Sequence, residues 1–252
     1  SDGDDFYHRG VCWYAKKIIR PDGECVFLEV EAASQIAEVY LNGTCVGRHQ
    51  GGFSSFRIDL TETMRPGENL LLISVDNGES EKTYPQFADF TFFGGLYRGV
   101  KLIVVPKNHL KLEAGDPGLH VTAELLEDGS ASVRTDTGIH TGTRGTFCFT
   151  IEDAEGRTVE KNVTEKGEAT FTLREPHLWD GVKDPYLYTA RVRLEESGDE
   201  VAVRFGVRQF SVDAELGFFL NGKPYPLRGV SRHQDRQGKG WAVTEADHRQ
   251  DI

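Results

Sequence analysis

Charged side chains crowd near the C-terminal end of this sequence in a pattern that is typical of a ligand site. Arg228, Arg232, His233, Asp235 and Arg236 all fall within residues 228–236. This is more charge than the end of a buried strand needs for solubility, and such clusters lie where strand ends meet a ligand. We therefore expect His233 and Asp235 to line a site. The plainer alternative for a single loop histidine is a surface or supporting role.

The segment before this cluster predicts a β-hairpin. An apolar run at Phe218–Leu220 meets Asn221-Gly222, and a second run follows through Leu227 and Val230. Asn-Gly between two apolar runs is the strongest short-range hairpin signal. We expect residues 225–231 to form a further strand and residues 232–243 a loop. Thr244 at the N-cap and Asp247 at N3 then predict the start of a helix.

Aromatic residues are unusually dense before the middle of the chain, in the stretch from Tyr84 to Tyr97. Its rings are Tyr84, Phe87, Phe90, Phe92, Phe93 and Tyr97. One interpretation is that they cap a sandwich core. The other is that some of them form a wall of a sugar pocket, because sugars present apolar C–H faces that rings can cover.

Composition narrows the class of partner. The formal net charge is −11, which argues against nucleic acid or an anionic membrane as partner. No stretch approaches the roughly 18 apolar residues of a membrane span, and no signal peptide is visible, so we expect a cytoplasmic protein, although the natural N-terminus is expected to lie further upstream. The four cysteines also follow no pattern of a metal or redox site. They lack C-x-x-C spacing, and we expect them to be buried free thiols.

Short strands and tight turns predict an all-β fold. Residues 1–107 read as one sandwich of the jelly-roll type, and residues 108–213 show about seven strands in about a hundred residues, which fits an immunoglobulin-like sandwich. In the second block Leu119, Phe149 and Val192 lie on the faces predicted to point inward. Residues 214–252 form a third part with the hairpin and the charged cluster.

Five segments resemble glycoside hydrolase family 2, the family of the large β-galactosidases, β-glucuronidases and β-mannosidases. They are YLNGTCVGRHQGGFSSFRIDLT (40–61), DFTFFGGLYRGV (89–100), EPHLWDGVKDPYLYTARV (175–192), RFGVRQFSVD (204–213) and L-N-G-K-P with L-R-G-V-S-R-H (220–233). The resemblance implies a jelly-roll domain, an immunoglobulin-like domain, and, in residues 214–252, the truncated start of a (β/α)8 TIM barrel. Among activities, DFTFFGGLYR in this segment favours a β-galactosidase over a β-glucuronidase, and a β-glucuronidase or β-mannosidase of the same family is the alternative.

The resemblance also implies roles for three residues. Asp89 stands where the family places an aspartate that contacts the sugar and a bound sodium ion; the alternative is an aspartate that closes a turn. His233 matches a histidine that contacts the sugar. The resemblance also places Asp235 at the site, but the sequence differs from the family here: the chain reads His-Gln-Asp-Arg where many members read His-Glu-His-His.

Hydrolysis with retention needs two carboxyl groups roughly 5 Å apart. In this family both are glutamates on later barrel strands, one of them in an Asn-Glu pair, and this sequence contains no Asn-Glu pair. We therefore expect an N-terminal fragment of an enzyme for terminal β-galactosides that is inactive alone and needs no cofactor. The parent is expected to be a homo-oligomer that uses magnesium and sodium. Two alternatives stay open: a carbohydrate-binding module and a structural assembly unit.

Overall fold

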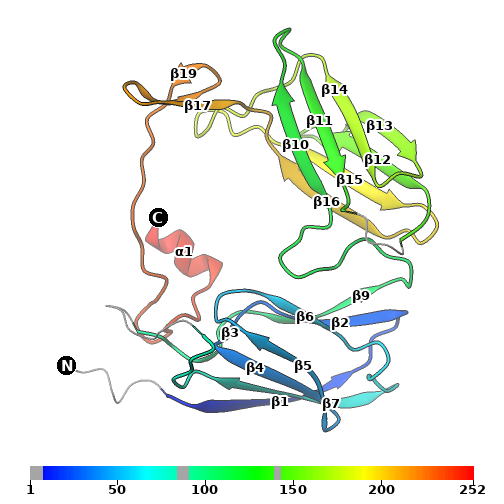
Figure 1. The fold of residues 1–252 in the computed structure, drawn as a ribbon, viewed down its shortest axis with the longest axis vertical. Helices are drawn as coiled ribbons and strands as arrows, with labels where there is room; N and C mark the ends of the chain where they lie inside the picture. The colour runs from blue at the N-terminus through cyan, green and yellow to red at the C-terminus, as the bar shows by residue number, and fades with distance from the viewer. Residues whose placement is uncertain (1–7, 84–90, 139–142) are drawn as a thin grey trace. The chain divides into compact units, whose positions relative to one another are not determined.

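The computed structural model describes residues 8–83, 91–138 and 143–252, and these are almost entirely β-structure with a single short helix (Figure 1). They divide into two units. The first unit contains residues 1–105 and 231–252, and the second contains residues 106–230. The expected all-β class is confirmed, and within the described residues no barrel closes.

Two sheets and a two-stranded ladder form the first unit. The larger sheet has the order β1-β7-β4-β5, the smaller β6-β2-β9, and β3 pairs with β8. Their bounds are β1 Val11–Ile19, β2 Cys25–Val30, β3 Ala33–Ser34, β4 Ile36–Leu41, β5 Thr44–Gln50, β6 Phe56–Asp59, β7 Glu68–Asp76, β8 Gly95–Leu96 and β9 Val100–Val105. Alternate residues of β2, β4 and β7 point into one core, as the two-residue period of a strand requires.

Asn42 and Gly43 join β4 to β5 with positive φ angles of 51° and 87°. Asparagine and glycine tolerate this left-handed conformation, and it gives the turn that best matches the twist of paired strands. The Asn42 side chain also accepts a hydrogen bond from the Leu70 backbone at 3.0 Å. The turn predicted from the Asn-Gly pair is therefore present and tied to β7.

The second unit is a sandwich of two sheets with a small three-stranded extension. The sheet orders are β10-β11-β14, β13-β12-β15-β16 and β17-β18-β19. The bounds are β10 His120–Leu125, β11 Ala131–Asp136, β12 Phe147–Glu152, β13 Thr158–Thr164, β14 Glu168–Leu173, β15 Tyr188–Leu194, β16 Glu200–Phe205, β17 Phe210–Asp213, β18 Gly217–Leu220 and β19 Lys223–Pro224. Leu119, Phe149 and Val192 are fully buried, which confirms their predicted inward direction.

Residues 225–231 do not form the strand that the sequence predicts. The hairpin β18–β19 is present, with Asn221 and Gly222 at its turn, but after β19 the chain runs on without a sheet partner. Leu227 is 71% exposed and Val230 is 95% exposed. A strand needs neighbours that take its backbone hydrogen bonds, and none of the described residues offers them here.

The cysteine prediction is correct for pairing and partly wrong for burial. All four thiols are free, but Cys148 is buried whereas Cys12 and Cys25 are half-buried and Cys45 is exposed. Cys45 lies at the start of the edge strand β5, directly after the Asn42-Gly43 turn. Turn ends face solvent whatever residue occupies them, and this overrides the general preference of cysteine for the interior.

Phe149 provides a direct test of the second core. Replacing this fully buried ring by alanine should lower the free energy of unfolding of the second unit by about 3–5 kcal/mol, because the substitution leaves a cavity between the two sheets. The measurement is urea denaturation of the chain. Val182→Ala, at a position that is 91% exposed, is the control and should shift stability by no more than about 0.5 kcal/mol. Equal losses in the two variants would contradict this packing.

Candidate functional site

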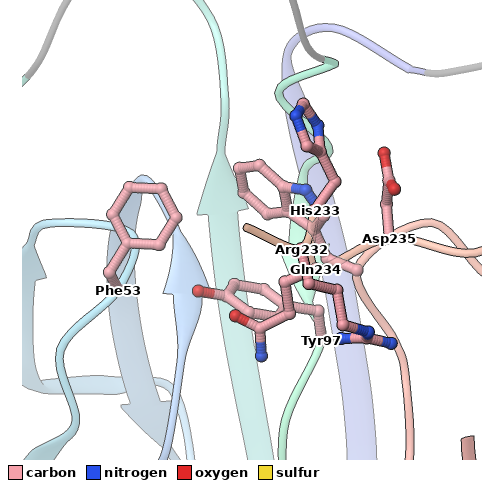
Figure 2. Close-up of a pocket in the computed structure, with 7 residues that line it drawn as sticks. Phe53, Tyr97, Arg232, His233, Gln234 and Asp235 are labelled. Carbon is pink, nitrogen blue, oxygen red and sulfur yellow. The ribbon is translucent and has the colours of Figure 1, made fainter. Parts of the chain in front are cut away.

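A pocket of about 270 Å³ lies within the first unit and brings aromatic rings against the charged segment (Figure 2). Its lining residues are Phe53, Tyr97, Arg232, His233, Gln234, Asp235 and Trp241. In Figure 2 Phe53 lies on one side, and His233 and Asp235 lie on the other. The lining therefore combines aromatic rings with hydrogen-bonding and charged groups.

Two loops of the sandwich place the rings. Phe53 lies between β5 and β6, directly after Gly51-Gly52, and Tyr97 follows β8. The Tyr97 hydroxyl donates a hydrogen bond to the Gly52 carbonyl, so the two loops are joined to each other. β8 is in turn held by β3 through the pair Ala33 and Leu96. Tyr97 is thus a buried residue fixed at both its backbone and its hydroxyl.

Trp241 packs into these rings. Its side chain is only 8% exposed, and its ring centroid lies 5.4 Å from those of Phe53 and Tyr97, 5.9 Å from Phe93 and 6.3 Å from Phe92. Three of the four contacts are edge-to-face, the arrangement that aromatic quadrupoles favour. We call Phe53, Phe92, Phe93, Tyr97 and Trp241 the aromatic cluster.

The ring-rich stretch was predicted either to cap a sandwich core or to form a wall of a sugar pocket, and the aromatic cluster bears on both interpretations. Phe92 and Tyr97 belong to a small buried cluster with Ala32 and Trp241, separate from the sandwich core, and Tyr97 also lines the pocket. Tyr84, Phe87 and Phe90 lie outside the described residues. Sequence reasoning missed Trp241, although a lone tryptophan in a polar loop was an available signal.

Residues 232–241, here called the pocket loop, are held on their other side by the helix α1 (Glu245–Asp251). Asp247 is the centre of this contact and is 6% exposed. Its carboxylate accepts hydrogen bonds from Lys239 Nζ at 2.7 Å, Arg236 Nη1 at 2.9 Å and the Thr244 backbone N–H at 2.8 Å. The Thr244 side chain in turn accepts from the Asp247 backbone, which confirms the predicted capping box.

These partners shift the titration of Asp247. The ammonium group of Lys239 has the largest effect, followed by the Thr244 backbone N–H, and together they hold the pKa of Asp247 well below its ordinary value. Arg232 makes a second link between the pocket loop and α1, with Nε 3.0 Å from Asp251 Oδ2 and Nη1 3.1 Å from His248 Nδ1. The cations of the pocket loop are therefore largely neutralised by α1.

Two of the three predicted site residues meet in the pocket. His233 is exposed and Asp235 is half-buried, and both line the same cavity. Asp235 also lines a neighbouring hollow of about 670 Å³ together with Phe93 and residues 236–240. Asp89 lies outside the described residues, so its predicted sugar and sodium contacts stay predictions.

Residues 8–83, 91–138 and 143–252 contain no group of three or more His, Cys, Asp and Glu side chains placed to hold a metal ion. The magnesium and sodium expected of the parent stay predictions. Among the described residues, no helix has the length and apolar character needed to cross a membrane.

Comparisons with known proteins match both units. The profile "Glycosyl hydrolases family 2, sugar binding domain" matches residues 4–106, and "Glycosyl hydrolases family 2" matches residues 116–208. The β-glucuronidase of Bacteroides fragilis is 32% identical over 98% of this chain and 38% of its own length. The β-galactosidase of Thermoanaerobacter pseudethanolicus is 30% identical over 97% of this chain and 34% of its own length.

Among solved structures, an FMN-binding β-glucuronidase from Facaelibacterium prausnitzii L2-6 superposes with a TM-score of 0.92 at 40% identity. The match covers 99% of this chain and 40% of that protein. The chain therefore spans between 34% and 40% of the length of these three relatives.

Asp247→Asn tests the link between the pocket loop and α1. The variant should lower the thermal midpoint of the first unit at pH 7, because the amide cannot hold Lys239 and Arg236 as a carboxylate does. The folded-state pKa is depressed, so the stabilisation is present above the unfolded value of about 4 and is lost as pH falls through the folded value.

The difference between the wild type and Asp247→Asn should accordingly be full at neutral pH and shrink in strong acid. Glu245→Gln is the matched control, because Glu245 lies in the first turn of the same helix with its side chain 77% exposed. Thermal melts at several pH values give the measurement. A difference that is absent at pH 7, or that does not change with pH, would contradict the assignment.

Proposed function

We propose that this chain, which belongs to glycosyl hydrolases family 2, supplies a sugar-binding wall of a β-glycosidase. The observation that carries the proposal is the pocket whose lining combines His233 and Asp235 with the rings of Phe53, Tyr97 and Trp241. Rings cover the apolar C–H faces of a sugar, whereas imidazole and carboxylate groups hydrogen-bond its hydroxyls. Such a pocket orients a glycoside without itself breaking a bond.

Bond cleavage in this proposal comes from outside the described pocket. Retaining hydrolysis uses one carboxyl group as acid and then base, and a second as nucleophile, about 5 Å from the first. Among the residues that the structure describes, Asp235 is the one carboxylate that lines the pocket. We therefore assign Asp235 to sugar binding, and the nucleophile and the acid to the part of the whole protein that this chain does not span.

The first candidate substrate is a terminal β-glucuronide. It is supported by the names of two relatives, the Bacteroides fragilis β-glucuronidase at 32% identity and the Facaelibacterium prausnitzii structure at 40% identity. A terminal β-galactoside is the second candidate. It is supported by the segment at residues 89–100 and by the Thermoanaerobacter pseudethanolicus β-galactosidase.

Hydrolysis of chromogenic β-glucuronide, β-galactoside and β-mannoside by the whole protein tests the proposal. We expect the highest kcat/KM on the glucuronide, and no turnover of any of the three by the 252-residue chain assayed beside it. A preference for the galactoside would select the second candidate. Turnover by this chain alone would contradict the proposal, since both reacting carboxyl groups would then lie within it. Light scattering on the same preparation tests the expected homo-oligomer.

His233→Ala in the whole protein should lower kcat/KM by about tenfold or more, the loss expected when a hydrogen bond to a bound substrate is removed. Steady-state kinetics on the preferred glycoside provide the measurement. His120→Ala is the control, because His120 begins β10 in the second unit and does not line the pocket. If both variants retain the wild-type kcat/KM, His233 has no part in binding the sugar.

A further inference from the structure

We propose that Trp241 is a positioning residue, which holds the pocket loop in the place where His233 and Asp235 face the sugar. The inference rests on the proposed function. Through Trp241, the rings at residues 92–97 hold His233 and Asp235 in place, although these two residues lie more than a hundred positions later in the sequence. The rings of the sandwich therefore set the shape of the pocket as well as lining it.

The indole of Trp241 is buried among rings of the first unit. Trp241 is 8% exposed and packs against four rings, of which Phe53 lies between β5 and β6 and the other three lie within residues 92–97, on either side of β8. The rest of the pocket loop is polar or glycine and is largely exposed. A polar loop has no apolar area of its own to bury, so the indole is its main apolar anchor.

Gly240 shows how closely the loop lies on the rings. A Cβ atom at this position would lie 2.9 Å from Phe93 Cδ1, and the residue has a positive φ of 54°. Both features favour glycine, because a side chain would collide with the ring and the backbone conformation is one that other residues rarely adopt. The contact between the pocket loop and Phe93 therefore leaves no space for a side chain.

A tight turn connects the backbone at Trp241 to the backbone next to Asp235. The Arg236 N–H donates to the Gly240 carbonyl at 3.1 Å, and the Gly240 N–H donates to the Arg236 carbonyl at 2.9 Å. Gly240 precedes Trp241, and Arg236 follows Asp235. A displacement of the indole therefore moves the backbone beside Asp235 directly.

The contact of the loop with α1 does not replace this anchor. Asp247 holds Arg236 and Lys239 through long, flexible side chains, which tolerate small movements of the backbone. Packed rings tolerate much less, because close-packed interiors transmit displacements. The aromatic cluster thus determines the position of the loop, and the ionic contacts with α1 keep it attached to the helix.

Trp241→Leu in the whole protein is the central variant. It should lower kcat/KM on the order of 100-fold, because small displacements of a binding group cost about that much. The KM should rise, since His233 and Asp235 then bind the sugar poorly. A purely structural defect would reduce the fraction of active protein, and would therefore lower the apparent kcat without changing KM.

Two further variants test whether the presence of a ring at residue 241 or the position of that ring matters. Trp241→Phe retains a ring and should recover most of the lost kcat/KM. Gly240→Ala retains the indole but pushes it away from Phe93, and should raise KM as Trp241→Leu does. Val39→Ala is the stability control, because Val39 is fully buried in the sandwich core and does not line the pocket. It should lower the thermal midpoint while leaving KM unchanged.

The outcomes distinguish the two proposals. A wild-type protein that cleaves none of the three glycosides contradicts the proposed function. A wild-type protein that is active, with KM unchanged in both Trp241→Leu and Gly240→Ala, overturns the positioning role and leaves the proposed function standing. A raised KM in these two variants together with an unchanged KM in Val39→Ala supports it.

Discussion

The packing of one indole against four other rings is the contact on which the candidate site depends. Residues 231–252 follow the whole second unit in sequence, yet they belong to the first unit. Trp241 is where the pocket loop enters the sandwich, and it packs between rings of two loops that Tyr97 and Gly52 already join. Each aromatic pair adds about 0.5–1.5 kcal/mol beyond the burial of apolar area. Without this contact, the polar residues before Trp241 would still be tied to α1 by Arg232, Arg236 and Lys239, but not to the rings of the sandwich.

Two different kinds of interaction restrain the pocket loop. The aromatic cluster is apolar and short-ranged, and it defines one side of the loop closely. On the other side, Asp247 joins Arg236 and Lys239 to the first turn of α1, where a negative charge is also favoured by the helix dipole. Asp247 is buried, so salt screens these ion pairs less than it would screen exposed ones.

Under the proposed function, sugar binding and bond cleavage are carried out by different parts of the whole protein. The described part of the chain contributes rings, the His233 imidazole and the Asp235 carboxylate to the pocket, and groups of these kinds can bind and orient a sugar. Catalysis gains from such orientation, because reacting atoms that are held in place need less ordering in the transition state. The reacting carboxyl pair is a separate requirement, which the proposal assigns to the remainder of the whole protein.

Local signals in the sequence predicted local structure well. The Asn-Gly turns at residues 42–43 and 221–222 depend on two residues, and the capping box at Thr244 depends on four, so each could be predicted without knowledge of the fold. Contacts between distant segments could not. The role of Trp241 requires knowing that residue 241 returns to residues 92–97, and no pattern near residue 241 states this.

The strand predicted at residues 225–231 is absent for the same reason, because it too depended on contacts with distant segments. Their alternation is compatible with a strand, but a strand forms only where neighbours accept and donate its hydrogen bonds. His233 was predicted from the family resemblance and a charge cluster, and the structure places it in the pocket. That placement arises from the aromatic cluster, which the sequence showed only as an unusual density of rings.

A structure of the whole protein with an uncleaved β-glycoside bound is the most direct test of the central claim. We expect a sugar ring between Tyr97 and His233, with Trp241 still buried in the aromatic cluster and Asp235 within hydrogen-bonding distance of a sugar hydroxyl. A sugar bound elsewhere, with His233 and Asp235 directed away from it, would show that this pocket does not bind the substrate.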